Sequence, residues 1–346
     1  MPLAALLVLV VAQPHLSGTS VVTSVLSNTQ LPLDNHGAPL ITGEASALRL
    51  ANGSYFFFFN NWGRCLCWPS CAASGGPTEC SATCTTNRTD PVHTVVAYRT
   101  EDFTSWTNLG VAFVPPGAGS IFRPIVVYNP STDMFVMWYE RYNTPWNPLK
   151  TGTTYAVAIS KAVAGPFIVA KDSVRLHGDG RADGCGDANI LVDDDGAAYH
   201  VRVGLVIERL DSDFLGGSGI VYQLNPGGRS LSLEAPVFFK HAGWYYVMAG
   251  SLSCAGGATT VYAWQARAPL GPYSFQGVIG VRSATRAQGS TSFLVGGQRI
   301  WLGNQWGTPN ATRNHELLRF ARLDFNLNGS LAPLKWEDNV TVTVPI

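Results

Sequence analysis

Five polar residues of this chain share one local context, in which each opens a short apolar run that leads into a turn and a second run. They are Glu44, Arg123, Asp187, Glu234 and Gln288. Carboxylates donate and accept protons in general acid–base catalysis, and a guanidinium or an amide can orient them or bind a polar substrate. If the fold brings these residues to one place, they form a candidate catalytic site.

The sequence around each opening predicts a strand, a tight turn and a second strand. The turn signals are Asn52-Gly53, Asn129-Pro130, Asp195-Gly196, His241-Ala242-Gly243 and Gly296-Gly297. Outer segments also resemble one another, at Thr94–Leu109, Tyr155–Val169 and Tyr262–Phe275. An all-β sandwich would share this alternation, but a repeated four-stranded unit is typical of propeller blades. The sequence therefore predicts an all-β, five-bladed β-propeller whose innermost strands bring the five openings to one mouth of a central cavity.

The spacing of the openings predicts a single domain over residues 20–346. The later intervals match one blade of about 40–50 residues. The first interval is longer because it contains Cys65, Cys67, Cys71, Cys80 and Cys84 in a Gly/Ser/Thr-rich stretch. We expect this stretch to be a cysteine-rich loop inserted in blade 1 and stapled by disulfides, with a zinc site as the alternative. Seven cysteines leave one unpaired, and a Cys185–Cys254 bridge is a further candidate because blades 3 and 4 are neighbours.

The N-terminus and the composition predict a secreted protein. Leu3–Val11 is an apolar run too short for a membrane span, and Ala12 suits signal-peptidase cleavage, so residues 1–12 are expected to be a signal peptide. Glycosylation acceptor sequences occur at Asn52, Asn87, Asn310, Asn328 and Asn339. The chain has 23 basic and 23 acidic residues without a basic stripe, which argues against nucleic acid and anionic membrane as partners. We expect a monomer with a polysaccharide or oligosaccharide substrate.

Several other chemistries lack their motifs. The chain has no Gly-x-Ser-x-Gly elbow, no phosphate-binding loop and no His-Glu-x-x-His, and its histidines have no metal-binding spacing. Asp193-Asp194-Asp195-Gly196 resembles a calcium loop, but its place between two apolar runs favours a hairpin turn. We therefore expect no cofactor and no catalytic metal, with a structural calcium ion as the alternative at that turn.

The remaining chemistry is that of paired carboxylates, which glycoside hydrolysis requires. Four segments resemble motifs of the family 43 glycoside hydrolases. They are Glu234-Ala235-Pro236 with its following Tyr-Tyr strand, Cys185–Val201, Phe122–Tyr139 and Gln288–Trp306. The resemblance spans nearly the whole chain from about Leu31 and is closest to the exo-β-1,3-galactanase branch. It implies an inverting, acid–base hydrolysis of a β-linked galactan or a related polysaccharide.

Carried over to this chain, the resemblance implies a role for each site residue. Glu234 would be the general acid, and Asp187 would orient it and raise its pKa by like-charge proximity. Gln288 would position or activate the attacking water, at about 6.5–9.5 Å from the acid. We expect substrate contacts from the remaining candidates, which are Arg123, Asn61, Trp62, Glu140 and Trp306.

The chain also departs from the pattern of that branch. Phe122 stands where the branch has a Glu that contacts sugar hydroxyls, and Glu44 is a carboxylate that the branch lacks at its first inner strand. Glu44 would then either replace the missing acceptor or act as the base. These departures leave two alternatives open: a β-xylosidase or α-arabinofuranosidase, and a carbohydrate-binding propeller without catalysis.

Overall fold

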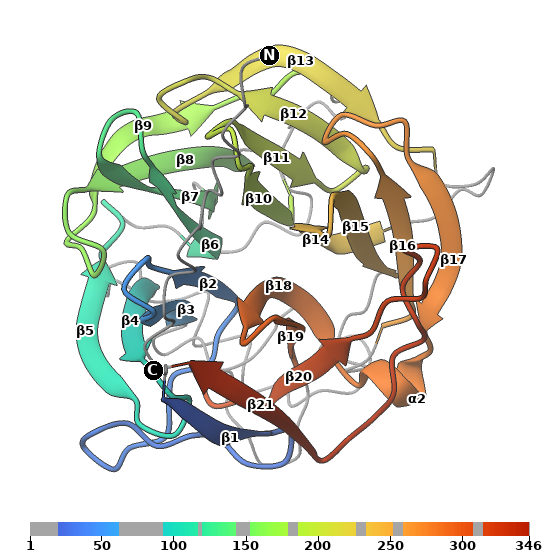
Figure 1. Cartoon of the computed structure of the whole chain (residues 1–346). Coiled ribbons are helices and arrows are strands. Elements are labelled where there is room, and N and C mark those ends of the chain that lie inside the picture. Colours follow the sequence, from blue (N-terminus) through green and yellow to red (C-terminus); the bar gives the residue numbers. More distant parts are fainter. Residues whose placement is uncertain are drawn as a thin grey trace, which may run out of the picture.

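The computed structural model shows five β-sheets arranged as blades around a central axis (Figure 1). It describes residues 20–61, 93–116, 120–142, 153–178, 186–225, 233–251, 259–306 and 314–345. Within these ranges the only helix is the short α2 (Arg282–Thr285). The predicted all-β, five-bladed propeller is confirmed.

Blades 1 to 4 each contain four antiparallel strands in sequence order, and blade 5 contains three. Blade 1 is β2 (Ala45–Arg49), β3 (Tyr55–Asn61), β4 (Thr94–Thr100) and β5 (Thr107–Phe113). Blade 2 is β6 (Ser120–Asn129), β7 (Met134–Tyr142), β8 (Thr153–Ser160) and β9 (Ile168–Val174). Blade 3 is β10 (Ala188–Val192), β11 (Ala198–Arg202), β12 (Val206–Leu210) and β13 (Gly217–Gln223). Blade 4 is β14 (Leu233–His241), β15 (Trp244–Ser251), β16 (Val261–Ala266) and β17 (Ser274–Gly280). Blade 5 is β18 (Gln288–Val295), β19 (Gln298–Asn304) and β20 (Leu318–Leu323).

The first strand of every blade lies innermost. In Figure 1, β2, β6, β10, β14 and β18 surround the axis. Neighbouring innermost strands contact one another around the ring, including β18 with β2. All five strands therefore begin at the same end of the central channel, and the polar residues at their starts can meet there.

The blades pack face to face, so both faces of each sheet are buried. On β3, Phe57 and Phe59 belong to the hydrophobic cluster shared with blade 5, whereas Phe56 and Phe58 belong to the cluster shared with blade 2. A cluster of this kind fills each of the five interfaces between neighbouring blades. This explains why the run Tyr55–Phe59 is apolar at every position instead of alternating. Each blade shares its core with two neighbours, which makes the ring one domain.

The two ends of the chain close the ring beside blade 5. β1 (Val21–Ser27) pairs antiparallel with β21 (Asn339–Pro345), and this ribbon packs against β20. The Asn28 side chain fastens it, because Asn28 Nδ2 donates to Phe320 O at 2.9 Å and Asn28 Oδ1 accepts from Phe320 N at 2.6 Å. Blade 5 thus departs from the repeated four-stranded unit, since its outer position is taken by strands from both ends of the chain.

All five predicted turns connect the first and second strands of their blades. The Asp193–Gly196 segment is a hairpin turn between β10 and β11, in which Gly196 N donates to Asp193 O at 2.9 Å. Its carboxylates accept from protein donors. Lys240 Nζ lies 2.5 Å from Asp193 Oδ1 and 2.8 Å from Asp194 Oδ2, and Tyr245 Oη donates to Asp193 Oδ2 at 2.5 Å.

Some sequence predictions concern residues outside the described ranges. They are the signal peptide at residues 1–12, Trp62, the acceptor sites Asn87 and Asn310, and the cysteines Cys65, Cys67, Cys71, Cys80, Cys84, Cys185 and Cys254. Asn52, Asn328 and Asn339 are described and are exposed. In the part of the chain that the structure describes, no helix has the length and apolar character to cross a membrane.

Candidate active site

The five openings converge at one end of the channel. Glu44 and Asp187 directly precede β2 and β10. Gln288 is the first residue of β18, Glu234 is the second residue of β14, and Arg123 is the fourth residue of β6. Hydrogen bonds and ion pairs join Glu44 and Asp187 to Arg123 and join Gln288 to Glu234, and the two groups meet where Asp187 accepts from Ala235 N, next to Glu234. The predicted convergence is therefore what the structure shows, whereas the catalytic role of each residue stays a prediction.

Arg123 is the centre of this network. Its backbone N donates to Glu44 Oε2 at 2.9 Å, and its Nε lies 3.2 Å from Glu44 Oε1. Its guanidinium also lies 3.0 Å from Asp187 Oδ2 and donates to Gly289 O at 2.7 Å. Burial disfavours the charged guanidinium, but Asp187, Glu44, Glu140 and Glu234 outweigh it and raise the pKa of Arg123. Arg123 is thus a permanent buried cation that holds residues of blades 1, 2, 3 and 5 together.

Irregular backbone near the starts of three innermost strands sets the direction of these side chains. β6, β14 and β18 each contain a register shift near their starts, at Phe122/Ile125, Glu234/Val237 and Gly289/Thr291. Arg123 (φ 50°) and Ala235 (φ 51°) are in the left-handed region, which is costly for residues with a Cβ, and a proline follows each of them. β-Bulges of this kind turn side chains out of the regular alternation and are common next to active sites.

Asp187 holds the backbone that carries Glu234. Asp187 Oδ2 accepts from Ala235 N at 2.9 Å, so its contact is with the residue directly after the predicted acid. The same oxygen accepts from Arg123, which compensates part of the negative field that we expected Asp187 to exert on Glu234. Asp187 therefore has the geometry to position Glu234, and its effect on the pKa of Glu234 stays a prediction.

Gln288 lies directly against Glu234, which differs from the expected spacing. Gln288 Nε2 donates to Glu234 Oε2 at 3.3 Å, so no water fits between the two groups. The reason is the order of the ring, because blades 4 and 5 are neighbours and the starts of their innermost strands touch. Trp306 Nε1 donates to Gln288 Oε1 at 2.7 Å. Because an indole nitrogen can only donate, this bond orients the amide with its nitrogen toward Glu234.

The other described site candidates lie on, or just after, the second strands of their blades. Glu140 on β7 pairs with Phe122, is 2% exposed and contributes to the negative field at Arg123. Trp306 follows β19 and lies at the site through Gln288. Asn61 is the last residue of β3, one strand outward from the channel, where it pairs with Thr94.

Sequence reasoning missed two polar residues that hydrogen-bond to the backbone at and near the candidate site residues. Asn60 is fully buried; its N donates to Glu44 O at 3.1 Å and its Nδ2 to Ile121 O at 2.8 Å. Asn304 Nδ2 donates to Thr42 O at 2.5 Å. Both residues lie at the ends of second strands, and a polar residue that ends an apolar run was the signal that could have found them. Among the described residues, no group of three or more His, Cys, Asp or Glu could hold a metal ion.

Comparison with known proteins decides the family. The model of glycosyl hydrolases family 43 matches residues 78–292, which is more than half of the chain. The chain belongs to family 43. This confirms the resemblance seen in the sequence and makes the protein a glycosidase by family. A comparison with curated proteins found no match.

Solved family 43 structures share the fold at low sequence identity. A β-1,3-galactosidase solved with galactodeoxynojirimycin is 19% identical with a TM-score of 0.71, over 90% of this chain and 99% of that one. An exo-β-1,3-galactanase from Phanerochaete chrysosporium, solved with galactose, is 21% identical with a TM-score of 0.69, over 91% of this chain and 68% of that one. An exo-β-1,3-galactanase from Clostridium thermocellum is 20% identical with a TM-score of 0.72, over 92% of this chain and 66% of that one. The chain thus spans about two thirds of each of these two galactanases.

Proposed function

We propose that this family 43 chain hydrolyses β-1,3-linked galactan or a related β-linked polysaccharide, with inversion. The reaction takes place at the end of the channel where the five polar residues at the strand starts meet. The observation that carries the proposal is the network in which Arg123 and Asp187 hold the start of β14, and with it Glu234, at that mouth. The galactanase and galactosidase names of several similar structures support the choice of substrate. We include extracellular secretion and a monomeric state in the proposal, on the evidence of the sequence.

Glu234 is proposed as the general acid. It lies at a bulge, is half-buried, and has its backbone anchored by Asp187 through Ala235 N. To act as the acid, Glu234 must hold a proton near the working pH, because it has to protonate the glycosidic oxygen. Gln288 contacts the same carboxyl group and is proposed to fix its orientation.

Glu44 is proposed as the group that activates water. Inversion requires a base on the face of the sugar opposite the acid. In a ring of five blades, blades 3 and 5 flank blade 4, so a group across the channel from Glu234 must come from blade 1 or 2. Glu44 comes from blade 1 and reaches the network through Arg123. Its ion pair with Arg123 favours the ionised carboxylate, which is the form a base must have when water attacks.

Phe122 supports a second candidate function. Its side chain is 5% exposed and packs edge-to-face on His93, with ring centroids 5.6 Å apart. An aromatic ring cannot accept hydrogen bonds from sugar hydroxyls as the corresponding Glu of the galactanase branch does. This favours a sugar with fewer polar contacts in that subsite, as in a β-xylosidase or an α-arabinofuranosidase.

The test is a panel of β-1,3-galactan, arabinoxylan and the corresponding aryl glycosides, with the anomeric product followed by proton NMR. Release of galactose in the inverted configuration supports the main proposal, and release of xylose or arabinose supports the second. Glu234→Gln should lower turnover of the natural oligosaccharide by about 10²–10⁴-fold. The loss should be far smaller for an aryl glycoside with a good leaving group, which needs little protonation. Binding of oligosaccharide without hydrolysis would show instead that the chain is a carbohydrate-binding propeller.

A further inference from the structure

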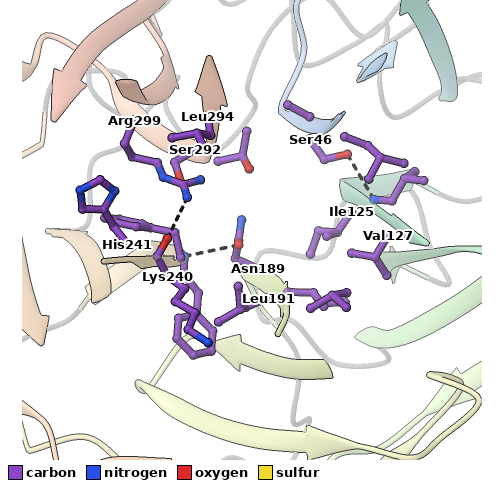
Figure 2. Close-up of a pocket in the computed structure, with 18 of the residues that line it drawn as sticks. Ser46, Ile125, Val127, Asn189, Leu191, Lys240, His241, Ser292, Leu294 and Arg299 are labelled. Carbon is purple, nitrogen blue, oxygen red and sulfur yellow. Dashed lines mark hydrogen bonds between the residues drawn. The ribbon is translucent and has the colours of Figure 1, made fainter. Parts of the chain in front are cut away.

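A cavity of about 510 Å³ lies toward the opposite end of the channel from the candidate active site (Figure 2). It is lined by the middles and the far ends of the innermost strands and by the turns that follow them. The Asn189 side chain lines this cavity and joins β10 to two other innermost strands. Its Nδ2 donates to Ser290 O of β18 at 3.2 Å, and its Oδ1 accepts from Phe238 N of β14 at 3.4 Å. A second cavity of about 360 Å³ adjoins the first and shares Leu48, Ser292, Leu294 and Arg299 with it. Neither cavity is lined by any of the five residues of the candidate active site, which are Glu44, Arg123, Asp187, Glu234 and Gln288.

Arg299 lines both cavities and carries a charge that no described carboxylate balances. Its Nη2 donates to Lys240 O at 2.8 Å, and its guanidinium lies 5.3 Å from the centroid of the Phe239 ring. Its Nε is buried without a hydrogen-bond partner, and no ion pair involves it within the described ranges. Arg123, by contrast, is paired with both Glu44 and Asp187. Burial alone lowers the pKa of Arg299 to about 10, so the side chain is still a cation at neutral pH.

The other basic residues that line the first cavity, Lys240 and His241, do not add to this charge. Lys240 pairs with both Asp193 and Asp194, at 2.5 and 2.8 Å, and Asp194 also lines the first cavity. His241 stacks on Phe325 with ring centroids 3.9 Å apart, and burial together with the charge of Arg299 lowers its pKa, so it is neutral at pH 7. Among the described residues that line the first cavity, Arg299 is thus the cation without a carboxylate at ion-pair distance, and it is the group that a negative charge on a ligand would meet.

Ser292 supplies a second polar group beside Arg299. Leu294 pairs with Arg299 across β18 and β19, and Ser292 lies two residues earlier on the same face of β18. Figure 2 shows Ser292 near the Arg299 side chain at the cavity. Its Oγ is buried without a hydrogen-bond partner in the described structure. A guanidinium and a hydroxyl placed together form a donor set for the two oxygens of a carboxylate.

We propose that this cavity binds the carboxylate of an acidic monosaccharide, such as a uronic acid residue, with Arg299 as the anchor. Its volume lies within the range of small-molecule sites, about 300–1,000 Å³. Val127, Leu191 and Leu294 offer apolar wall to the C–H faces of a sugar ring, and Ser46, whose Oγ accepts from Val126 N, can still donate its hydroxyl proton to a sugar oxygen. A single uncompensated cation matches a carboxylate better than a phosphate dianion, which ordinarily requires more than one.

The test is calorimetric titration of the whole protein with D-glucuronate at low ionic strength, with D-galactose and acetate as comparison ligands. We expect glucuronate to bind more tightly than either, and Arg299→Met to weaken its binding at least tenfold. Arg322→Met removes an arginine that is paired with Asp324 at the surface, and it should leave binding unchanged. Ser292→Asp would place an internal carboxylate beside Arg299 and should abolish binding without removing the arginine, which covers the case in which Arg299→Met does not fold.

These results are separable from those of the active site. Arg299→Met and Ser292→Asp should leave glycoside hydrolysis unchanged, and Glu234→Gln should leave glucuronate binding unchanged. The proposal is overturned if the wild-type protein does not bind glucuronate, or if both Arg299→Met and Ser292→Asp bind it as the wild type does. Acetate binding as tight as that of glucuronate would overturn the assignment to a sugar acid.

Discussion

Trp306 controls the orientation of Gln288, and Trp306→Phe should therefore move the alkaline limb of the pH–activity profile. In the structure the indole N–H donates to Gln288 Oε1, which leaves Gln288 Nε2 facing Glu234. An N–H that faces a carboxyl group stabilises its ionised form and not its protonated form. Phenylalanine keeps an aromatic ring but has no donor, so the Gln288 amide can turn and accept a hydrogen bond from the protonated Glu234.

The size of the shift follows from the bond that is lost. A neutral hydrogen bond contributes about 0.5–1.5 kcal/mol net. One pH unit corresponds to about 1.36 kcal/mol, so the alkaline limb of kcat/KM should move upward by roughly 0.4–1.1 pH units. The assay is the pH profile of kcat/KM on the best oligosaccharide found in the substrate panel.

Two controls separate orientation from general damage. Gln288→Met removes the amide, so Trp306→Phe in that background should cause no further shift. Trp264→Phe removes another buried indole N–H, which donates to Asn225 O at 2.9 Å, and it should alter stability while the limb stays in place. An unchanged limb in Trp306→Phe, or one that moves to lower pH, would refute the reasoning.

Three further predictions concern charges and ring closure. Arg123→Met leaves the buried Glu44 and the half-buried Asp187 without their cation, so the free energy of unfolding in urea should fall by about 3–5 kcal/mol; a loss below 1 kcal/mol would contradict this. Burial and the charge of Arg202 hold the pKa of His200 well below its ordinary value. The unfolded chain therefore binds a proton below about pH 6.5 that the folded protein does not, and stability falls with decreasing pH by up to about 1.4 kcal/mol per unit. His200→Phe should remove that part of the slope, measured as unfolding free energy at pH 7 and pH 5 against wild type. Asn28→Ala removes two bonds to Phe320 and should destabilise the protein by about 1–3 kcal/mol in thermal or urea unfolding, whereas Asn326→Ala, in an exposed turn, should have little effect.

The sequence was most informative where a pattern has only one geometric solution. Asn52-Gly53 and Gly296-Gly297 each stand between two apolar runs, and both form the tight turns expected of them. Five repeated units of blade length favoured strands around a common axis over a sandwich, so the convergence of Glu44, Arg123 and Asp187 at one mouth could be predicted without coordinates. The separation of Gln288 from Glu234 could not, because it depends on how closely the starts of two neighbouring innermost strands approach and on the side-chain rotamers that this packing selects.

The sequence by itself determined the fold class, the turns and the set of polar residues at the channel mouth, because strand periodicity and turn chemistry are local properties of the chain. Only the tertiary structure decided the partners of those residues. Arg123 takes its counter-ions from blades 1 and 3 by contacts between segments far apart in sequence, and Gln288 receives the indole of Trp306 from beyond the hairpin of its own blade. It also decided that the half-buried Arg299, with its Nε buried, lies beside a cavity without a described carboxylate partner, since the burial of a charge depends on what packs around it and no single strand carries that information.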